Sequence, residues 1–260
     1  MYFKGRKSNY DKHPYLEIDH MEKEAFADID TIAEELKRKI KNIEKPKRLI
    51  VFDYYHGIQR SEIEEIIEKI QPDVKMFCER AKLPEEQLRR KLEHNITDDR
   101  VFGVLGTQVM RDFYDEPEME KLCRQIREYQ QGVIVVYGIG AALFAEKADL
   151  LIYGDINRWE IQLRYRSGEL DNWGVGNYDE DILRKYKRGY FVEWRMLDRH
   201  KAELFDRIDY FLDMNHKKES KMITKKALDE MIRQFAKRPF RLVPYFDEGI
   251  WGGRWMEEVC

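Results

Sequence analysis

The sequence has little cysteine and no long apolar run, and both absences exclude classes of protein. Only three of the 260 residues are cysteine, namely Cys78, Cys123 and Cys260. Because they are far apart and form no CxxC pair, neither a zinc knuckle nor a disulfide framework is supported. No apolar run approaches the length of a membrane span, and the start of the chain lacks the apolar core of a signal peptide. These absences predict a cytoplasmic protein with reduced thiols.

The sequence also lacks an excess of one charge and a metal-binding pattern. Lys and Arg number 47 and Asp and Glu number 50, which gives a formal net charge of -3. No basic field therefore argues for nucleic acid. The six histidines form neither HxH nor HExxH. We expect the chain to bind neither nucleic acid nor a membrane, and to hold no metal of its own.

Apolar runs of strand length alternate with helical patterns along most of the chain. The run VIVVY at 133–137 is bounded by glycines, which is typical of a parallel strand buried on both faces. Helical patterns include 28–43, 73–95, 104–114 and 224–237. The predicted fold is α/β, with a mainly parallel sheet flanked by helices. Its predicted strands are 48–54, 133–137, 150–153, 207–212 and 240–246.

Glycines and arginines follow several of these strands, at the sheet edge where ligands bind in such folds. Arginine offers a planar donor fork suited to phosphate, and glycine turns that open helices add backbone N–H donors. The alternative is that the glycines only form turns and the arginines only pair with Glu160, Glu169 or Asp155. The candidate phosphate-binding residues are His56, Gly57, Arg60, Gly138, Gly140, Asp155, Arg158, Arg164, Arg166, Arg195 and Arg199.

No complete nucleotide-binding motif is present. The first strand is followed by DYYHGIQRSE, in which Gly57 stands alone and Arg60 occupies the place of the phosphate-loop lysine before Ser61. A degenerate nucleotide site, or none, is therefore favoured over catalytic use of ATP. Ser61 with Glu64 also fits a plain helix-capping box. The pair Gly138 and Gly140 is not a GxGxxG fingerprint, because Leu143 takes the third position.

Two parts of the sequence resemble a known protein family. The segment PYFDEGIWGGRWM at 244–256 resembles the opening of the cupin catalytic domain of class I mannose-6-phosphate isomerases. The stretches TDDRVFG, VIVVYGIGAAL and INRWEIQLRYRSGE are similar to the N-terminal extension of some bacterial members. That extension looks like the uridine kinase branch of the P-loop fold, with an acidic residue after a strand and an arginine-rich lid. The matching residues are Phe246, Glu248, Ile250, Trp251, Gly252 and Gly253 in the first part, and Asp155, Arg158, Arg164 and Arg166 in the second.

The resemblance implies a nucleoside-kinase-like, degenerate P-loop domain at residues 25–246. An N-terminal arm at 1–24 would precede it, and the start of a truncated cupin isomerase domain at 247–260 would follow. The full-length family interconverts mannose 6-phosphate and fructose 6-phosphate with zinc held in the cupin domain, whose ligands would lie beyond residue 260. We therefore expect this chain to be non-catalytic and without a cofactor, with the cupin domain as partner and a sugar phosphate or nucleotide as ligand. A sugar or nucleoside phosphotransferase with an atypical phosphate loop, and a purely structural module, are the alternatives.

Overall fold

The computed structural model describes residues 16–237, and the chain divides into two compact units. The larger unit spans residues 23–225 and contains the sheet, and the smaller joins residues 1–22 to 226–260. The described part of the smaller unit is chiefly helix α8 (Lys225–Ala236). The predicted strand at 240–246, the cupin-like segment at 244–256 and most of the predicted N-terminal arm lie outside the described residues.

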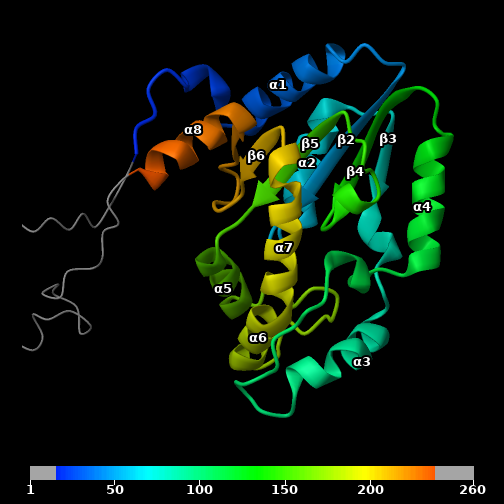
Figure 1. Ribbon diagram of the computed structural model, residues 1–260, viewed down its shortest axis with the longest axis vertical. Helices are drawn as coiled ribbons and strands as arrows, with labels where there is room; N and C mark the ends of the chain where they lie inside the picture. Colours follow the sequence, from blue (N-terminus) through cyan, green and yellow to red (C-terminus); the bar gives the residue numbers. More distant parts are fainter. Residues whose placement is uncertain (1–15, 238–260) are drawn as a thin grey trace, which may run out of the picture. The chain divides into compact units, whose positions relative to one another are not determined.

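Seven strands form one sheet in the order β1-β7-β6-β5-β2-β4-β3 (Figure 1). The strands from β2 to β6 pair in parallel, whereas β7 is antiparallel to β6 and β1 is antiparallel to β7. Numbered along the chain, the five parallel strands have the spatial order 2-3-1-4-5. The α/β fold class predicted from the sequence is confirmed. The strands are β1 (Ala25–Phe26), β2 (Lys47–Tyr54), β3 (Val74–Phe77), β4 (Gly132–Gly138), β5 (Leu150–Asp155), β6 (Tyr210–Asp213) and β7 (Lys221–Thr224).

Two predicted helical segments are wrong. Within 73–95, β3 occupies the first residues and pairs in register with β4, and helix α3 (Glu85–Ile96) begins only after Pro84. A strand of four residues is too short to reveal its period in the sequence. Within 104–114, only a 3-10 turn at Met110–Phe113 is helical, because residues 104–109 run as a loop whose backbone bonds to Asn95 and Phe191.

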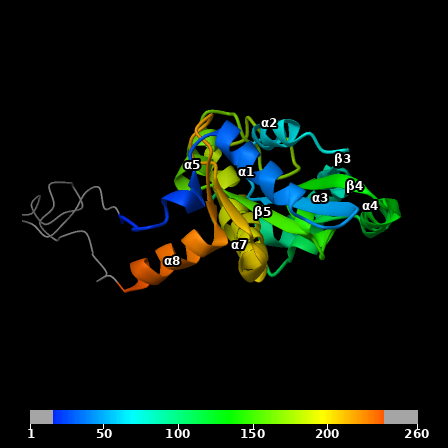
Figure 2. The same cartoon turned by 90° about the horizontal axis from the view of Figure 1, so that it is seen from above.

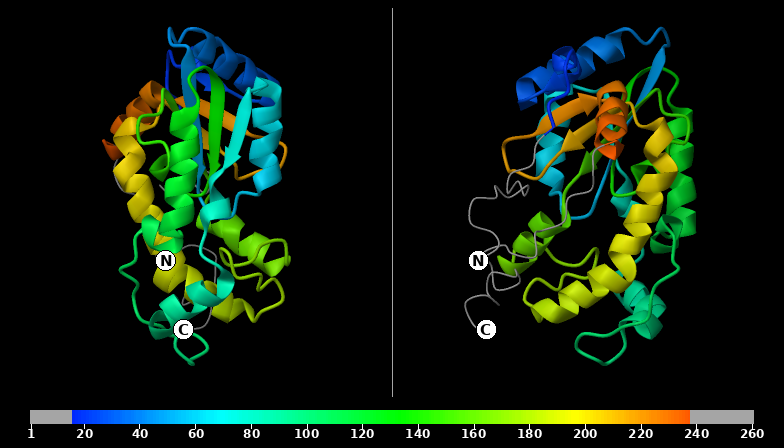
Figure 3. Two further views of the ribbon diagram at one scale, coloured as in Figure 1. Left: turned by 90° about the vertical axis from the view of Figure 1, so that its right-hand side faces the viewer. Right: turned by 60° about the vertical axis from the view of Figure 1, so that its left-hand side comes forward.

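Helices cover both faces of the sheet (Figure 2). On one face, the Tyr210 hydroxyl donates to Glu35 of α1, and on the other, Asp53 of β2 contacts His200 of α7. Helices α3, α5 and α6 lie beyond the carboxyl ends of the strands (Figure 3). No helix within residues 16–237 has the length and apolar composition needed to span a membrane. The remaining helices are α1 (Ile29–Lys41), α2 (Arg60–Ile70), α4 (Glu116–Glu128), α5 (Arg158–Arg166), α6 (Ile182–Arg188) and α7 (Trp194–Leu204), with a 3-10 turn η4 (Ala141–Leu143) after β4.

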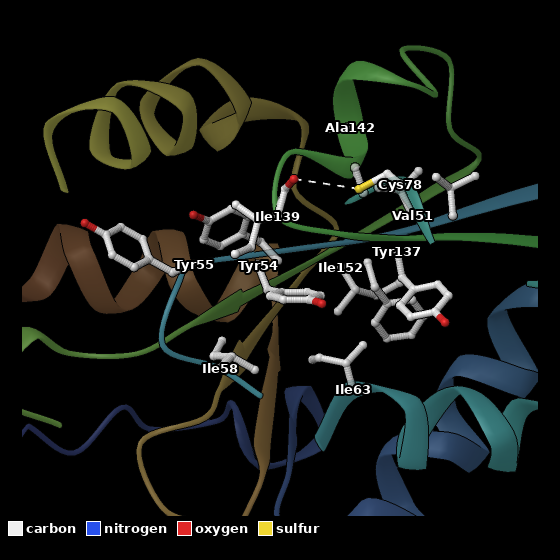
Figure 4. Packing of buried hydrophobic residues seen from close by; sticks show 14 of the residues in the cluster. Val51, Tyr54, Tyr55, Ile58, Ile63, Cys78, Tyr137, Ile139, Ala142 and Ile152 are labelled. Carbon is white, nitrogen blue, oxygen red and sulfur yellow. Dashed lines mark hydrogen bonds between the residues drawn. The ribbon is translucent and has the colours of Figure 1, made fainter. Parts of the chain in front are cut away.

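The core lies around the three central strands, β4, β2 and β5. The run Ile50–Phe52 of β2 is at most 1% exposed, and Ile63, Ile66 and Ile67 of α2 are fully buried. Burial of each such side chain contributes about 1.5–3 kcal/mol. Figure 4 shows this packing where β2 ends, with Tyr54 and Ile58 near Ile63. The same packing fixes the turn that leads from β2 into α2.

Candidate functional site

The turn after β2 is shaped by packing against α5. Gly57 has a φ of +119°, and a Cβ atom there would lie 2.7 Å from Cγ1 of Ile161. Glycine is therefore needed for the close approach of α5. His56 is buried, and desolvation by burial lowers its pKa to about 4. Its ring is thus neutral at pH 7, and its Nδ1 atom has no hydrogen-bond partner among the described residues.

The N terminus of α2 already holds a carboxylate of the chain. Oε2 of Glu62 accepts a hydrogen bond from the Gln59 backbone N–H at 2.8 Å. Arg164 is 2% exposed and donates to Glu62 from Nη1 at 2.8 Å and from Nη2 at 3.4 Å. It also donates to Glu160 at 3.0 Å and to the Gly57 carbonyl at 2.8 Å. A buried ion pair therefore stands where a helix N terminus would receive a phosphate.

Arg60 does not take the part of a phosphate-loop lysine. It forms an ion pair with Glu64 at 2.6 Å, and its guanidinium lies 4.2 Å from the centre of the Phe77 ring. The helix begins at Arg60 after Gln59, so the predicted capping box of Ser61 and Glu64 is wrong. The predicted cap comes too late in the chain, because the oxygen that accepts from the Gln59 backbone N–H belongs to Glu62 and not to Ser61.

The arginines of α5 do not converge on one cleft. The segment is helical, as the kinase resemblance favours. Arg158 is 47% exposed, forms an ion pair with Asp198 and lies 5.3 Å from the Trp194 ring centre. Arg166 donates to the Tyr186 hydroxyl at 2.6 Å. The predicted common arginine cleft is therefore wrong, because Arg164 is buried against acids while the other two arginines have separate partners.

The glycine turn after β4 is occupied by a second carboxylate. Asp53 is 1% exposed and accepts from the backbone N–H groups of Gly140 at 3.0 Å and Ala142 at 2.9 Å. Its Oδ2 lies 2.8 Å from Nε2 of His200. Burial alone would lower the pKa of His200, but the Asp53 carboxylate outweighs burial and raises it. Gly138 and Gly140 have positive φ values of +134° and +79°, so the turn itself requires glycine.

A third carboxylate, that of Glu79, completes this pattern. Its Oε1 accepts from the Ile139 N–H at 3.2 Å, and its Oε2 accepts from Nε1 of Trp173 at 2.7 Å. Desolvation by burial raises the pKa of Glu79 in spite of these hydrogen bonds. Backbone donors in both glycine turns are thus used by the chain's own acids.

Asp155 lies at the end of β5 and pairs with Lys201 at 3.0 Å. Burial raises the pKa of Asp155, and its Oδ1 has no hydrogen-bond partner within residues 16–237. It does not cap α5, because Asn157 accepts from the Glu160 N–H at 2.7 Å. Among the residues that the structure describes, no group of three or more His, Cys, Asp and Glu side chains could hold a metal ion.

The two predicted arginines of α7 lie apart from these carboxylates. Arg199 donates to the carbonyls of Gly106 and Gln108 and so holds the loop before Met110. Arg195 is half-buried and has no ion pair in the described part of the chain.

Sequence reasoning missed Asp53, Glu62, Glu79, His200 and Lys201. Asp53 carries a signal, because an acid interrupts the apolar run of a buried strand. The other four sit in ordinary helical charge patterns, and their partners are supplied by distant segments.

These pairs lie inside a recognised domain. A family model described as a domain of unknown function, DUF8485, matches residues 28–237. The chain belongs to this family. Both the Glu62–Arg164 and Asp53–His200 pairs therefore fall within the DUF8485 domain. No curated protein matches the chain. Among solved structures, the chain is similar to one described as a "putative fructose transport system kinase" from Silicibacter sp. TM1040, with 9% identity, a TM-score of 0.45, and coverage of 67% of this chain and 94% of that chain.

Proposed function

We propose that this DUF8485 domain is a non-catalytic, kinase-like domain that accompanies an isomerase of the class I mannose-6-phosphate type. The attachment to an isomerase is supported by the resemblance of the segment at 244–256 to the start of the cupin domain. The loss of phosphoryl transfer is supported by the edge of the sheet, where a kinase-like fold would bind its phosphates.

One observation carries the proposal. Three side-chain carboxylates, those of Asp53, Glu62 and Glu79, accept from backbone N–H groups at the turns after β2 and β4. A phosphate at a helix N terminus needs those donors free. It would also meet the negative charge of Glu62, which is held in place by buried Arg164.

The charges at the turn after β2 also oppose phosphate binding. Two unit charges 4 Å apart interact by about 4 kcal/mol at the effective dielectric constant of a partly buried site. The Glu62–Arg164 ion pair is held by an interaction of this order, so a phosphate would have to compete with Glu62 for Arg164, and the sequence has no phosphate-loop lysine to bind it instead. The charges at this edge of the sheet therefore stabilise the fold of the domain without a bound phosphate.

Titration calorimetry of the full chain with ATP and Mg²⁺, and with ADP and Mg²⁺, tests the loss of phosphoryl transfer. We expect no saturable heat and no release of phosphate above a protein-free control. Saturable binding of a nucleoside triphosphate, or transfer of its terminal phosphate to a sugar or nucleoside, would establish the phosphotransferase alternative instead.

The link to an isomerase is tested separately. The reading frame that follows the codon of Cys260 is expected to continue into a cupin domain with the Gln, two His and Glu zinc ligands of the family. A stop codon there would remove this part of the proposal. We also expect no conversion of mannose 6-phosphate by this chain with added zinc, and a turnover above that of a metal-free sample would contradict that expectation.

A further inference from the structure

A separate cavity lies beside α4, at the amino end of β2 rather than at the carboxyl edge described above. Its volume is about 640 Å³, and Lys47 and Leu49 at the start of β2 contribute to its wall. Helix α4 forms one side, and the segment from Leu143 to Lys147 forms the other. Small-molecule sites usually enclose about 300–1,000 Å³, so the cavity has the size of a ligand site.

Apolar side chains form part of the wall of this cavity. Met119, Cys123 and Ile126 project from α4, and Leu143 and Phe144 face them from the segment after β4. The Cys123 thiol is half-buried and donates to the Phe144 carbonyl at 3.7 Å. A ligand in this space would therefore place an apolar body against these side chains.

The rim of the cavity carries an excess of positive charge. Five cations and three acids line it, which gives a formal charge of +2 in a chain whose net charge is -3. Arg111 is neutralised by Glu116. The guanidinium and ammonium groups of Arg124, Arg127 and Lys147 make no hydrogen bond or ion pair within residues 16–237. The acids are Glu116, Glu120 and Glu146, and the cations are Lys47, Arg111, Arg124, Arg127 and Lys147.

We propose that this cavity binds a phosphate monoester with an aromatic or aliphatic body. The body would contact Cys123 and Phe144, and the phosphate would be held by Arg124, Arg127 and Lys147. A phosphate monoester carries a charge of about -1.5 to -2 at pH 7, which matches the excess of +2 on the rim. Arginine supplies the planar, bidentate donors that suit a phosphate. Arginines on a merely solvated helix face would not need to line a cavity of this size.

Phenyl phosphate is the probe that combines both features, and Cys123 is the reporter. In the Cys260→Ser variant of the full chain, Cys123 is the accessible thiol, because Cys78 is buried. We expect phenyl phosphate to slow alkylation of Cys123 by iodoacetamide in a saturable way. Benzyl alcohol, benzoate and inorganic phosphate should protect less, since each lacks the apolar body or the dianion. Absence of saturable protection by phenyl phosphate would overturn the site, and equal protection by benzoate would overturn its assignment to a phosphate.

Charge-matched variants separate the rim from general electrostatics. Replacing Arg124 and Arg127 by glutamine should weaken phenyl phosphate binding by about tenfold or more for each charge-assisted hydrogen bond lost. Replacing Lys37 and Lys41 of α1 by glutamine changes the net charge equally, and because neither lysine lines the cavity, binding should be unchanged. Equal weakening in both double variants would overturn the proposal. Thermal melts of both variants establish that they are folded, and Lys147→Gln gives an independent second measurement.

Discussion

Replacing Arg164 by methionine removes the cation that holds Glu62 at the start of α2. Methionine keeps an unbranched side chain of similar reach, but it leaves the Glu62 carboxylate, which is 15% exposed, without its partner. Removing one member of a buried ion pair costs about 3–5 kcal/mol. For a domain of this size each kcal/mol lowers Tm by about 2–4 °C, so we expect Tm to fall by about 6–20 °C.

Urea unfolding at pH 7 measures the free energy, and scanning calorimetry measures Tm. The matched control is Arg158→Met, because Arg158 is also a paired arginine of α5 but is 47% exposed, and exposed pairs contribute about 0–1 kcal/mol. The double variant Glu62→Gln with Arg164→Met removes both charges and should recover part of the loss. If the Arg164→Met and Arg158→Met losses were equal, the assignment of Arg164 as a buried structural cation would be refuted.

Three further predictions concern the same edge of the sheet. The pKa of His200 is raised in the folded protein. The stabilising effect of His200 is therefore fully present below about pH 6.5 and is lost as the pH rises through the raised pKa. A stability difference between wild type and His200→Gln that did not change from pH 5 to 9 would contradict this prediction. The pKa of Glu79 is also raised, above 4.5. The wild type should therefore lose stability relative to Glu79→Gln as the pH rises through the raised pKa. Urea unfolding midpoints of both proteins at pH 4 and pH 8 measure this loss. Gly57→Ala places an alanine at a φ of +119° and brings its Cβ into overlap with Ile161. It should therefore cost more stability than Gly168→Ala, whose added Cβ meets nothing within 4 Å. Backbone strain alone costs about 1–3 kcal/mol, so equal losses of stability in thermal melts would rule out the overlap.

The central strands could be predicted from the sequence, whereas the short ones could not. The runs at 133–137 and 150–153 are apolar throughout because both faces of their strands are covered. In contrast, β3 contains Lys75 and β7 begins with Lys221, both exposed. Their strand conformation depends on pairing with β4 and β6, and a window of four residues carries no such information.

The sequence predicts glycines and arginines at this edge of the sheet, but it does not show which charged side chains pair there. Glu62 and Arg164 are 102 residues apart in the chain, and the sequence shows the charge of each without showing which charge it meets. The sequence therefore leaves two interpretations of Arg164, as a donor for phosphate or as a partner of acids such as Glu160, and the structure shows it paired with Glu160 and Glu62. Asp53 was the detectable signal, since an acid in a buried strand needs partners and here finds His200 and two backbone N–H groups.

The carboxylates at the strand ends also restrict how this domain can evolve. Acquiring a phosphate loop at this turn would require the replacement of Glu62, yet the loss of Glu62 alone would deprive buried Arg164 of its closest acid. Changing Asp53 first would likewise leave His200 and two backbone donors without an acceptor. Each first step would cost about 3–5 kcal/mol from a total stability of about 5–15 kcal/mol, before any affinity for phosphate is gained. A phosphate site at this edge of the sheet is therefore not reached by single mutations, and it requires several coupled substitutions at once.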